Sequence, residues 1–167
     1  MNLEIANCEQ SKEIANLVNQ AYRGEIGWTK ESHLVSGDRI SSKKVEDIIL
    51  AKNLHLLIVR DDLKIISCCC VEKNKQSAYF GLFAVHPNLQ SKGIGKSILN
   101  LVEKYVKNIL HLHIIKMVVI SQRKELISYY ERRGYSKVQI KQEYPKNLDA
   151  GSPKIEGLTI EHLEKSI

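Results

Sequence analysis

The segment LQSKGIGKS, residues 89–97, joins an apolar run to a stretch with helical periodicity and decides how the fold is interpreted. Its last three residues match the end of the Walker A pattern G-x-x-x-x-G-K-[ST], which needs a glycine where this chain has Gln90. The dinucleotide pattern G-x-G-x-x-G also fails, because Gly93 and Gly95 are followed by Ile98 where the third glycine belongs. The segment therefore matches neither of these two phosphate-binding loops.

The position of the glycines still favours an anion site. A strand that leads through a glycine-rich turn into a helix exposes free backbone N–H groups at the positive end of the helix dipole. Glycines at positions 93 and 95 remove side chains where an anion would approach, and they permit the dihedrals of an anion-binding nest. A tight turn without a ligand uses the same glycines, so the pair alone leaves both interpretations open.

Hydrophobic periodicity along the chain predicts a mixed α/β sheet. Strands are expected at 2–7, in the two halves of 55–72 joined at Asp61-Asp62, and at 77–85, 113–121, 135–143 and 156–164. Helices are expected at about 11–22, 45–49, 94–105 and 124–133. Segments 22–39 and 144–154 are irregular, the first with a short helical turn. We predict one domain, residues 1–167, with about seven strands flanked by about four helices.

Composition limits the classes of function. The chain is 43% hydrophobic and 26% charged, as in ordinary soluble proteins. No apolar run approaches the roughly 18 residues of a membrane span, and MNLEIANCEQSKE is no secretory signal, so we expect a cytoplasmic protein without a membrane partner. The net charge of +6 suits anionic ligands, but the lysines are dispersed without interleaved aromatics, so no nucleic acid partner is predicted.

No metal site is predicted. Cys68, Cys69 and Cys70 are contiguous, and neighbours in a strand point to opposite faces, so they cannot converge on one ion. His111 and His113 have no carboxylate or cysteine cluster near them. We expect the cysteines to be reduced and to pack as small hydrophobic residues.

Two motifs together resemble a known family. The pattern [Gln/Arg]-x-x-Gly-x-[Gly/Ala] after LFAVHPN resembles motif A of the GNAT superfamily of acyl-CoA-dependent N-acetyltransferases, with Gln90, Gly93 and Gly95 in its defining positions. The segment YYERRGY, residues 129–135, resembles the family's second signature, aromatic-Tyr-x-x-x-Gly-[Phe/Tyr]. The resemblance covers essentially the whole chain and implies the GNAT fold.

The resemblance also implies the cofactor and its contacts. In the GNAT fold, strands 77–85 and 113–121 would be parallel neighbours that splay apart to hold acetyl-CoA. The pyrophosphate of the cofactor would lie on the backbone amides of Gln90, Ser91, Lys92, Gly93, Ile94, Gly95, Lys96 and Ser97. The pantetheine arm and the thioester would face the backbone of Phe83, Ala84 and Val85. Ser121 stands where many relatives bond the cofactor with an asparagine, and a serine has a shorter reach.

Tyr130 resembles the general acid of the family, placed near the sulfur of the leaving thiolate. Proton transfer from a phenol of pKa about 10 to a thiolate of pKa about 8.5 is uphill by about 2 kcal/mol, which favours a hydrogen-bond donor. Periodicity alone favours packing instead, because Leu126 and Tyr130 share one helix face. Tyr129 is expected to pack.

No general base is assigned from the sequence. The strand 77–85 contains no carboxylate, and Glu72, at the end of the preceding strand, is the nearest candidate. Glu25 and His86 are alternatives, as is a water relay to solvent.

The acceptor would meet the segment AYRGEIGW, residues 21–28, in which Tyr22, Arg23 and Trp28 are the candidate contacts together with Glu72. The loop 145–154 would form the opposite wall. The resemblance implies acetyl transfer from acetyl-CoA to a primary amine of a small molecule, by direct attack in a ternary complex. A peptide N-terminus or lysine as acceptor, a non-catalytic acyl-CoA-binding module and a homodimer remain open alternatives.

The absence of a metal constellation and of paired cysteines in the sequence gives a first prediction. Neither EDTA nor a reductant should lower the melting temperature, measured by differential scanning fluorimetry in matched buffers. A drop of several degrees in EDTA would reveal a structural metal ion.

Overall fold

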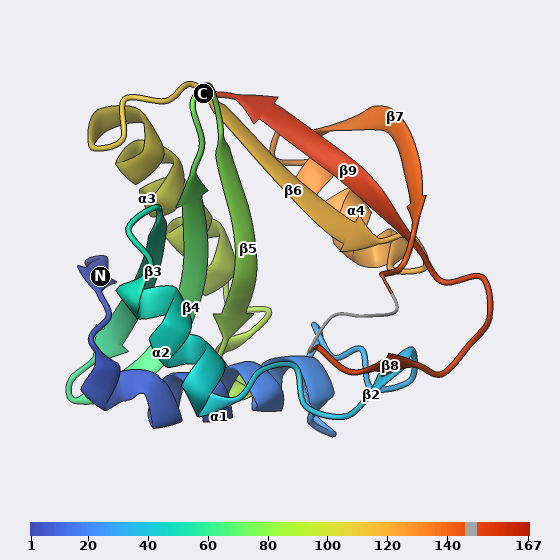
Figure 1. Ribbon diagram of the computed structural model, residues 1–167, viewed down its shortest axis with the longest axis horizontal. Helices are drawn as coiled ribbons and strands as arrows, with labels where there is room; N and C mark the ends of the chain where they lie inside the picture. Colours follow the sequence, from blue (N-terminus) through green and yellow to red (C-terminus); the bar gives the residue numbers. More distant parts are fainter. Residues whose placement is uncertain (146–149) are drawn as a thin grey trace.

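The computed structural model describes residues 1–145 and 150–167, and its main sheet has seven strands in the order β1-β3-β4-β5-β6-β9-β7 (Figure 1). These strands are β1 (Glu4–Ile5), β3 (Leu54–Asp61), β4 (Lys64–Lys73), β5 (Ala78–Val85), β6 (Ile114–Ile120), β7 (Ser136–Glu143) and β9 (Thr159–Ser166). A second, two-stranded sheet pairs β2 (Val35–Ser36) with β8 (Ser152–Pro153). The helices are α1 (Ser11–Arg23), α2 (Ser42–Leu50), α3 (Ile94–Asn108) and α4 (Lys124–Glu131), with one-turn helices η1 (Cys8–Gln10) and η2 (Pro87–Leu89).

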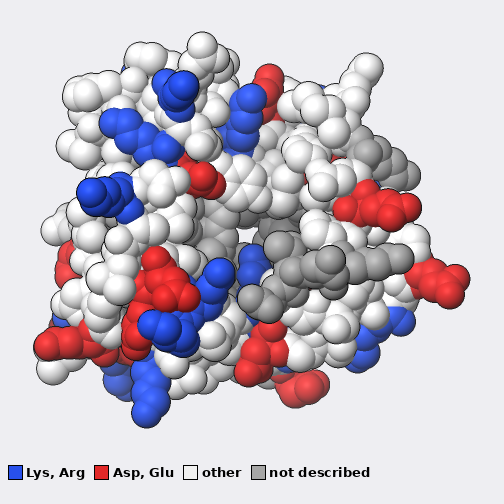
Figure 2. All heavy atoms as spheres, in the orientation of Figure 1, with Lys and Arg blue, Asp and Glu red and all other residues white. Residues whose placement is uncertain are grey.

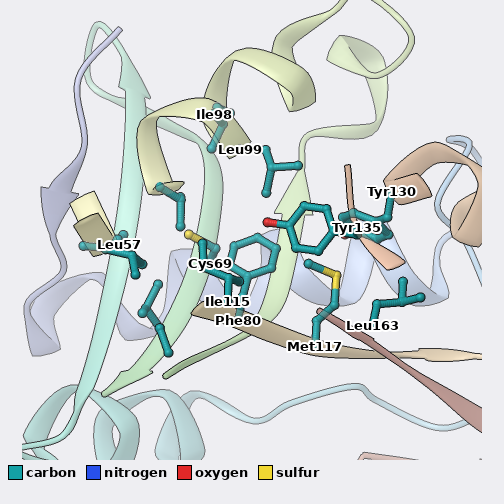
Figure 3. Packing of buried hydrophobic residues seen from close by; sticks show 14 of the residues in the cluster. Leu57, Cys69, Phe80, Ile98, Leu99, Ile115, Met117, Tyr130, Tyr135 and Leu163 are labelled. Carbon is teal, nitrogen blue, oxygen red and sulfur yellow. The ribbon is translucent and has the colours of Figure 1, made fainter. Parts of the chain in front are cut away.

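Helices cover both faces of the main sheet. α1 and α2 lie on one face, and α3 and α4 lie on the other (Figure 1). The apolar stripe predicted for α1 is buried against the sheet, with Ile14 and Val18 fully inaccessible. On the other face, Ile98 and Leu99 from α3 and Tyr130 from α4 pack over Phe80 and other side chains of the sheet (Figure 3). No helix in the described part of the chain is long and apolar enough to cross a membrane.

The predicted pair of splayed parallel strands is confirmed. β5 and β6 pair only through Ala78 with Ile115 and Tyr79 with Lys116. Beyond these residues the two strands diverge towards their carboxyl ends (Figure 1). β6 stays paired with β9 as far as Ile120, so the sheet opens on the β5 side alone. The backbone groups of β5 that face the opening therefore lack a strand partner.

A bulge in β5 sets which side chains face this opening. The pairing of β4 with β5 shifts between Cys68–Ala84 and Cys70–Gly81, so β5 carries one extra residue there. Leu82 has a φ of 52°, a left-handed conformation that is strained for a leucine. Because the bulge reverses the alternation, the ring of Phe83 lies 5.3 Å from that of Phe80, on the same face of the sheet. Without the bulge, Phe83 would point to the opposite face.

Several boundaries differ from expectation. The first strand is short because Asn7 caps η1: its side chain accepts from Glu9 N–H, and its own N–H donates to Gln10 Oε1. The last strand begins at Thr159, later than the predicted 156. β2 and β8 were not predicted, since strands of two residues show no periodicity. Residues 146–149 of the predicted loop lie outside the described residues.

The cysteines in β4 give the second prediction. Cys68 and Cys69 are 1% exposed, and burial raises the pKa of the Cys68 and Cys70 thiols to about 12. Cys8 is exposed. A disulfide reagent at pH 8 should therefore modify Cys8 rapidly and the β4 cysteines only as the protein unfolds. Thiol titration with and without denaturant measures this, and Cys8→Ser should abolish the fast phase. Any fast-reacting thiol in native Cys8→Ser would contradict the prediction that the β4 cysteines are protected.

Candidate active site

The segment between η2 and α3 presents a row of free backbone amides. Ser91 and Gly93 have φ values of 61° and 80°, which turn the chain sharply before α3. The N–H groups of residues 91–96 meet no acceptor among the described residues; the first bond of the helix runs from Ser97 N–H to Gly93 O, at 3.2 Å. Free amides at the start of a 15-residue helix form an anion site, because the donors and the helix dipole both favour negative charge.

The two glycines serve different needs. A Cβ at position 93 would meet no heavy atom within 4 Å, so Gly93 is required by its positive φ. A Cβ at Gly95 would lie 3.1 Å from Tyr129 Oη and 3.9 Å from Phe83 and Val85. Gly95 therefore makes room for the Tyr129 hydroxyl beside the free amides, and the row of free donors fits a bound pyrophosphate.

Two cavities meet beside this segment. The first, which we call the loop cavity, has a volume of about 280 Å³. It is lined by Ser91, Gly93, Gly95 and Lys96 of the loop and helix start, Phe83 and Val85 of β5, and Tyr129, Tyr130 and Arg133 at α4. The second, the strand cavity, has a volume of about 320 Å³ and lies between the splayed strands, against 79–83 and 117–120. Figure 2 shows this face hollowed near its centre, with blue Lys and Arg side chains in and beside the hollow.

Tyr130 lies where the cavities meet. It lines both and is 6% exposed. The rings of Tyr129 and Tyr135 contact it edge-on, at centroid distances of 5.3 and 5.7 Å, which fix its orientation. Burial raises the pKa of Tyr130 well above its ordinary value, and the neighbouring Tyr22 and Tyr129 add to the shift. Its hydroxyl is therefore a protonated donor at neutral pH.

Tyr129 does more than the expected packing. Its ring lies between the indole of Trp28, at 5.5 Å between centroids, and the guanidinium of Arg133, at 3.4 Å from the ring centroid. Its hydroxyl stands over Gly95 in the loop cavity. Trp28, predicted as an acceptor contact, lines the loop cavity as well and not the strand cavity.

The side chain of Gln90 turns away from the free amides. Its Oε1 accepts from the N–H groups of Trp28 and Thr29, and its Nε2 donates to Thr29 Oγ1 and Val85 O, both at 2.9 Å. Gln90 therefore fastens the segment after α1 to the end of β5. The sequence motif gave no sign of this role.

Buried charges that the sequence did not single out stabilise the same segment. Glu31 is 7% exposed and pairs with Arg23 Nη1 at 2.6 Å. Arg123, just before α4, has a side chain that is 3% exposed; it pairs with Glu125 and donates to Thr29 O at 2.9 Å. Glu31 and Arg123 line both cavities. Charged residues in irregular segments are usually solvated, so no pattern in the sequence distinguished these two.

The predicted acceptor contacts separate in the structure. Tyr22 lines both cavities. Arg23 lines neither, and donates instead to Gly37 O at 2.9 Å and Ala150 O at 2.7 Å. Glu72 also lies outside both cavities, paired across the sheet with Tyr79 and accepting from Asn53. Of the alternatives considered for the base, Glu25 is exposed and the imidazole of His86 caps η2.

Some predicted cofactor contacts also lie outside the cavities. Ala84 is fully buried on the face covered by α1. Ser121 is 5% exposed, lines neither cavity, and its Oγ has no hydrogen-bond partner among the described residues. Ile94 packs on the core, so it offers the site its backbone only, and the side chain of Lys92 is exposed. The predicted amide contacts of Gln90 and Ser97 are not free, because these N–H groups already donate to Pro87 O and Gly93 O.

The family model described as "Acetyltransferase (GNAT) domain" matches residues 10–147. The chain therefore belongs to the GNAT family of acetyltransferases and is an acyltransferase. Members of this family use acetyl-CoA as the acetyl donor. The predictions of family, fold and enzyme class are thus confirmed. No curated protein matches the chain significantly.

Solved structures agree on the fold. A mutant of the spermidine N-acetyltransferase SpeG from Vibrio cholerae is 19% identical, with 99% of this chain and 95% of that chain covered, at a TM-score of 0.73. The protein smu.2055 from Streptococcus mutans is 15% identical, with 99% of each chain covered, at a TM-score of 0.75. A ribosomal-protein-alanine N-acetyltransferase from Escherichia coli is 11% identical, with 99% and 93% covered, at a TM-score of 0.73. At these identities the likeness shows the fold alone.

The close approach at Gly95 gives the third prediction. Gly95→Asp should weaken coenzyme A binding about 10- to 100-fold or more, because a side chain there would displace the Tyr129 hydroxyl and its carboxylate would repel the anion that the amides bind. Isothermal titration calorimetry with coenzyme A measures the loss. ATP should bind poorly to the unmodified protein.

Gly157→Asp is the matched control, since it introduces the same charge where a Cβ meets no heavy atom within 4 Å. It should leave coenzyme A affinity unchanged. Tight ATP binding without coenzyme A binding would contradict the assignment of the loop.

Proposed function

We propose that this chain transfers the acetyl group of acetyl-CoA to a primary amine of a small molecule, by direct attack within a ternary complex. The observation that carries the proposal is that the two cavities meet at Tyr130. One is bordered by the free amides of residues 91–96, and the other lies between the splayed strands. Donor and acceptor would enter from opposite sides and meet at a protonated hydroxyl.

The cofactor supplies an acetyl group activated as a thioester. The amides of residues 91–96 would bind its pyrophosphate, and the β5 backbone from Phe83 to Val85 would take the polar groups of the pantetheine arm. Unpaired N–H groups in this stretch are also suited to stabilise negative charge on the carbonyl oxygen during attack.

Tyr130 would act as a hydrogen-bond donor to the departing sulfur. Because burial raises its pKa, full proton transfer to a thiolate is less favourable than for an ordinary phenol. A donated hydrogen bond still stabilises the sulfur as negative charge develops on it. The Tyr130 hydroxyl can donate a hydrogen bond only while it is protonated. Because its pKa is raised, it stays protonated in neutral and mildly alkaline solution.

The walls of the strand cavity favour a small acceptor over a peptide. β2 pairs with β8, and Arg23 donates to Ala150 O, so the segment after α1 and the segment before β9 are joined beside the cavity. A peptide or protein acceptor needs an open groove along which several residues can lie. A non-catalytic acyl-CoA-binding module is disfavoured, since it has no use for a buried, protonated hydroxyl between the two cavities.

The direct test is a screen of amines and peptides with acetyl-CoA, monitored by release of free thiol. Coenzyme A binding without turnover on any acceptor would favour the non-catalytic module. Turnover on peptides alone would replace the small-molecule acceptor with a peptide.

Tyr130→Phe gives the fourth prediction. It keeps the ring and its packing but removes the donor, so kcat should fall about 100-fold, at the low end of general acid–base contributions. The KM for acetyl-CoA should change only a few-fold. Steady-state kinetics by thiol release measures both. Full turnover in Tyr130→Phe, with chemistry rate-limiting, would make Tyr130 a packing residue.

Phenylalanine substitutions at two other tyrosines serve as controls for this result. Tyr105→Phe removes a hydroxyl that lies 2.8 Å from His55 Nδ1, away from both cavities, and should leave the kinetics unchanged. Tyr129→Phe removes the hydroxyl over Gly95 and should raise the KM for acetyl-CoA with little change in kcat.

A further inference from the structure

Arg39 is held on the wall of the strand cavity by α1. Its backbone N–H donates to Asn19 Oδ1 at 2.7 Å, and its guanidinium lies 5.4 Å from the centre of the Tyr22 ring. The side chain is half-buried and lines the cavity. The position of this cation is therefore fixed by two residues of a packed helix.

Among the described residues, guanidinium groups outnumber carboxylates around the strand cavity. Its lining contains one carboxylate, Glu31, and two guanidinium groups, those of Arg39 and Arg123. Glu31 is already paired with Arg23, and Arg123 with Glu125. Arg39 has no acidic partner within residues 1–145 and 150–167. A partly buried guanidinium that lines a cavity is well placed to bind an anion there, through charge-assisted hydrogen bonds.

Three neutral hydroxyl donors also lie near Arg39, while Gln142 and His162, which line the same cavity, are hydrogen-bonded to each other. Tyr22, Tyr79 and Tyr144 line the same cavity, and each is close enough to Arg39 for its charge to affect the phenol pKa. Burial nevertheless keeps all three pKa values above the ordinary value, so these hydroxyls are protonated at neutral pH. Hydroxyls and a guanidinium match a carboxylate, which only accepts hydrogen bonds. Within the described lining, the one carboxylate that a second ammonium could meet is Glu31, which is already paired.

We infer that the acceptor is a small primary amine that also carries a carboxylate, and that Arg39 binds this carboxylate. The inference rests on the acetyl transfer proposed above. The amine would lie towards Tyr130, where the cavities meet, and the carboxylate towards Arg39 and the surrounding tyrosines. A polyamine, with a cation at each end, is the wrong partner for this cavity.

The same charge distribution assists the chemistry. An acceptor amine reaches the site largely as an ammonium and must lose a proton before it attacks. Nearby cations favour the neutral form and lower the pKa of the ammonium. The first proton can leave through solvent. The neutral amine then forms the amide bond and gives up a second proton, to solvent or to the departing thiolate, which leaves with the bonding electron pair of the C–S bond. No carboxylate base is required in the strand cavity.

The test compares acceptors matched in length. A series of ω-amino acids is assayed against the corresponding ω-amino amides and α,ω-diamines, with acetyl-CoA and thiol release as the readout. A short peptide with a free N-terminus and an acidic second residue tests whether the carboxylate belongs to a peptide. The variants are Arg39→Gln and Arg39→Lys. Arg60→Gln, which removes a partly buried arginine paired with Glu4 on the far edge of the sheet, is the matched control.

The unmodified protein should use at least one amino acid in the series with a kcat/KM about 10- to 100-fold above those of its amide and diamine counterparts, as expected for a charge-assisted pair. Arg39→Gln should abolish this preference, mainly by raising KM for the amino acid. Arg39→Lys should retain part of it, and Arg60→Gln all of it. Coenzyme A affinity should be the same in every variant.

Each other outcome is decisive. Preference for diamines, preference for the peptide, or coenzyme A binding without turnover on any carboxylate-bearing amine would overturn the inference and leave the cofactor site standing. An unchanged preference in Arg39→Gln would remove Arg39 from acceptor binding. Failure to bind coenzyme A would instead overturn the proposed acetyl transfer itself.

Discussion

The early separation of β5 from β6 is the constraint on which the rest of the structure depends. A sheet that stops pairing in its interior leaves backbone N–H and C=O groups without partners, and these are costly to bury. The free-energy cost of these unpaired groups is offset because each strand is paired on its other side: β5 pairs with β4, and β6 pairs with β9, along most of their lengths. The opening is therefore a rigid feature, and the strained bulge at Leu82 turns Phe83 towards it. A ligand with its own amide groups can satisfy the exposed edge as a further strand would.

The charges are arranged around the same opening. Free amides of α3 border one side, and the arginines before α2 and α4 border the other. Glu31 has a structural role between Arg23 and Arg123, since it allows two guanidinium groups to lie near one another in a buried position. The site is thus organised for anions on both sides, and the hydroxyl of Tyr130 is the neutral donor between them.

The sequence predicts those features for which the backbone requires a particular type of residue. Gly93 and Gly95 follow from a positive φ and a close approach, and the helix and strand periods follow from burial, so the turn and most elements were predictable from the residues. The splayed strands and the place of Tyr130 were expected only from the resemblance to the family. Arg39, Glu31 and Arg123 lie in segments with no period, and their burial depends on contacts between distant parts of the chain. Glu72 was the nearest carboxylate to the expected site because it ends the strand that precedes β5 in the sequence. The register places it opposite Tyr79, where β5 and β6 are still paired and no opening exists.

The hydrogen bonds of Gln90 connect the two halves of the molecule energetically. One amide side chain bonds both the segment that carries Glu31 and the end of β5, immediately before the free amides. Ordering either side therefore helps to order the other. Thermodynamic linkage makes such an effect reciprocal: the factor by which one ligand tightens the binding of the second equals the factor by which the second tightens the first. If a donor and an acceptor bind on the two sides that Gln90 connects, its hydrogen bonds are a direct path by which each could strengthen the binding of the other.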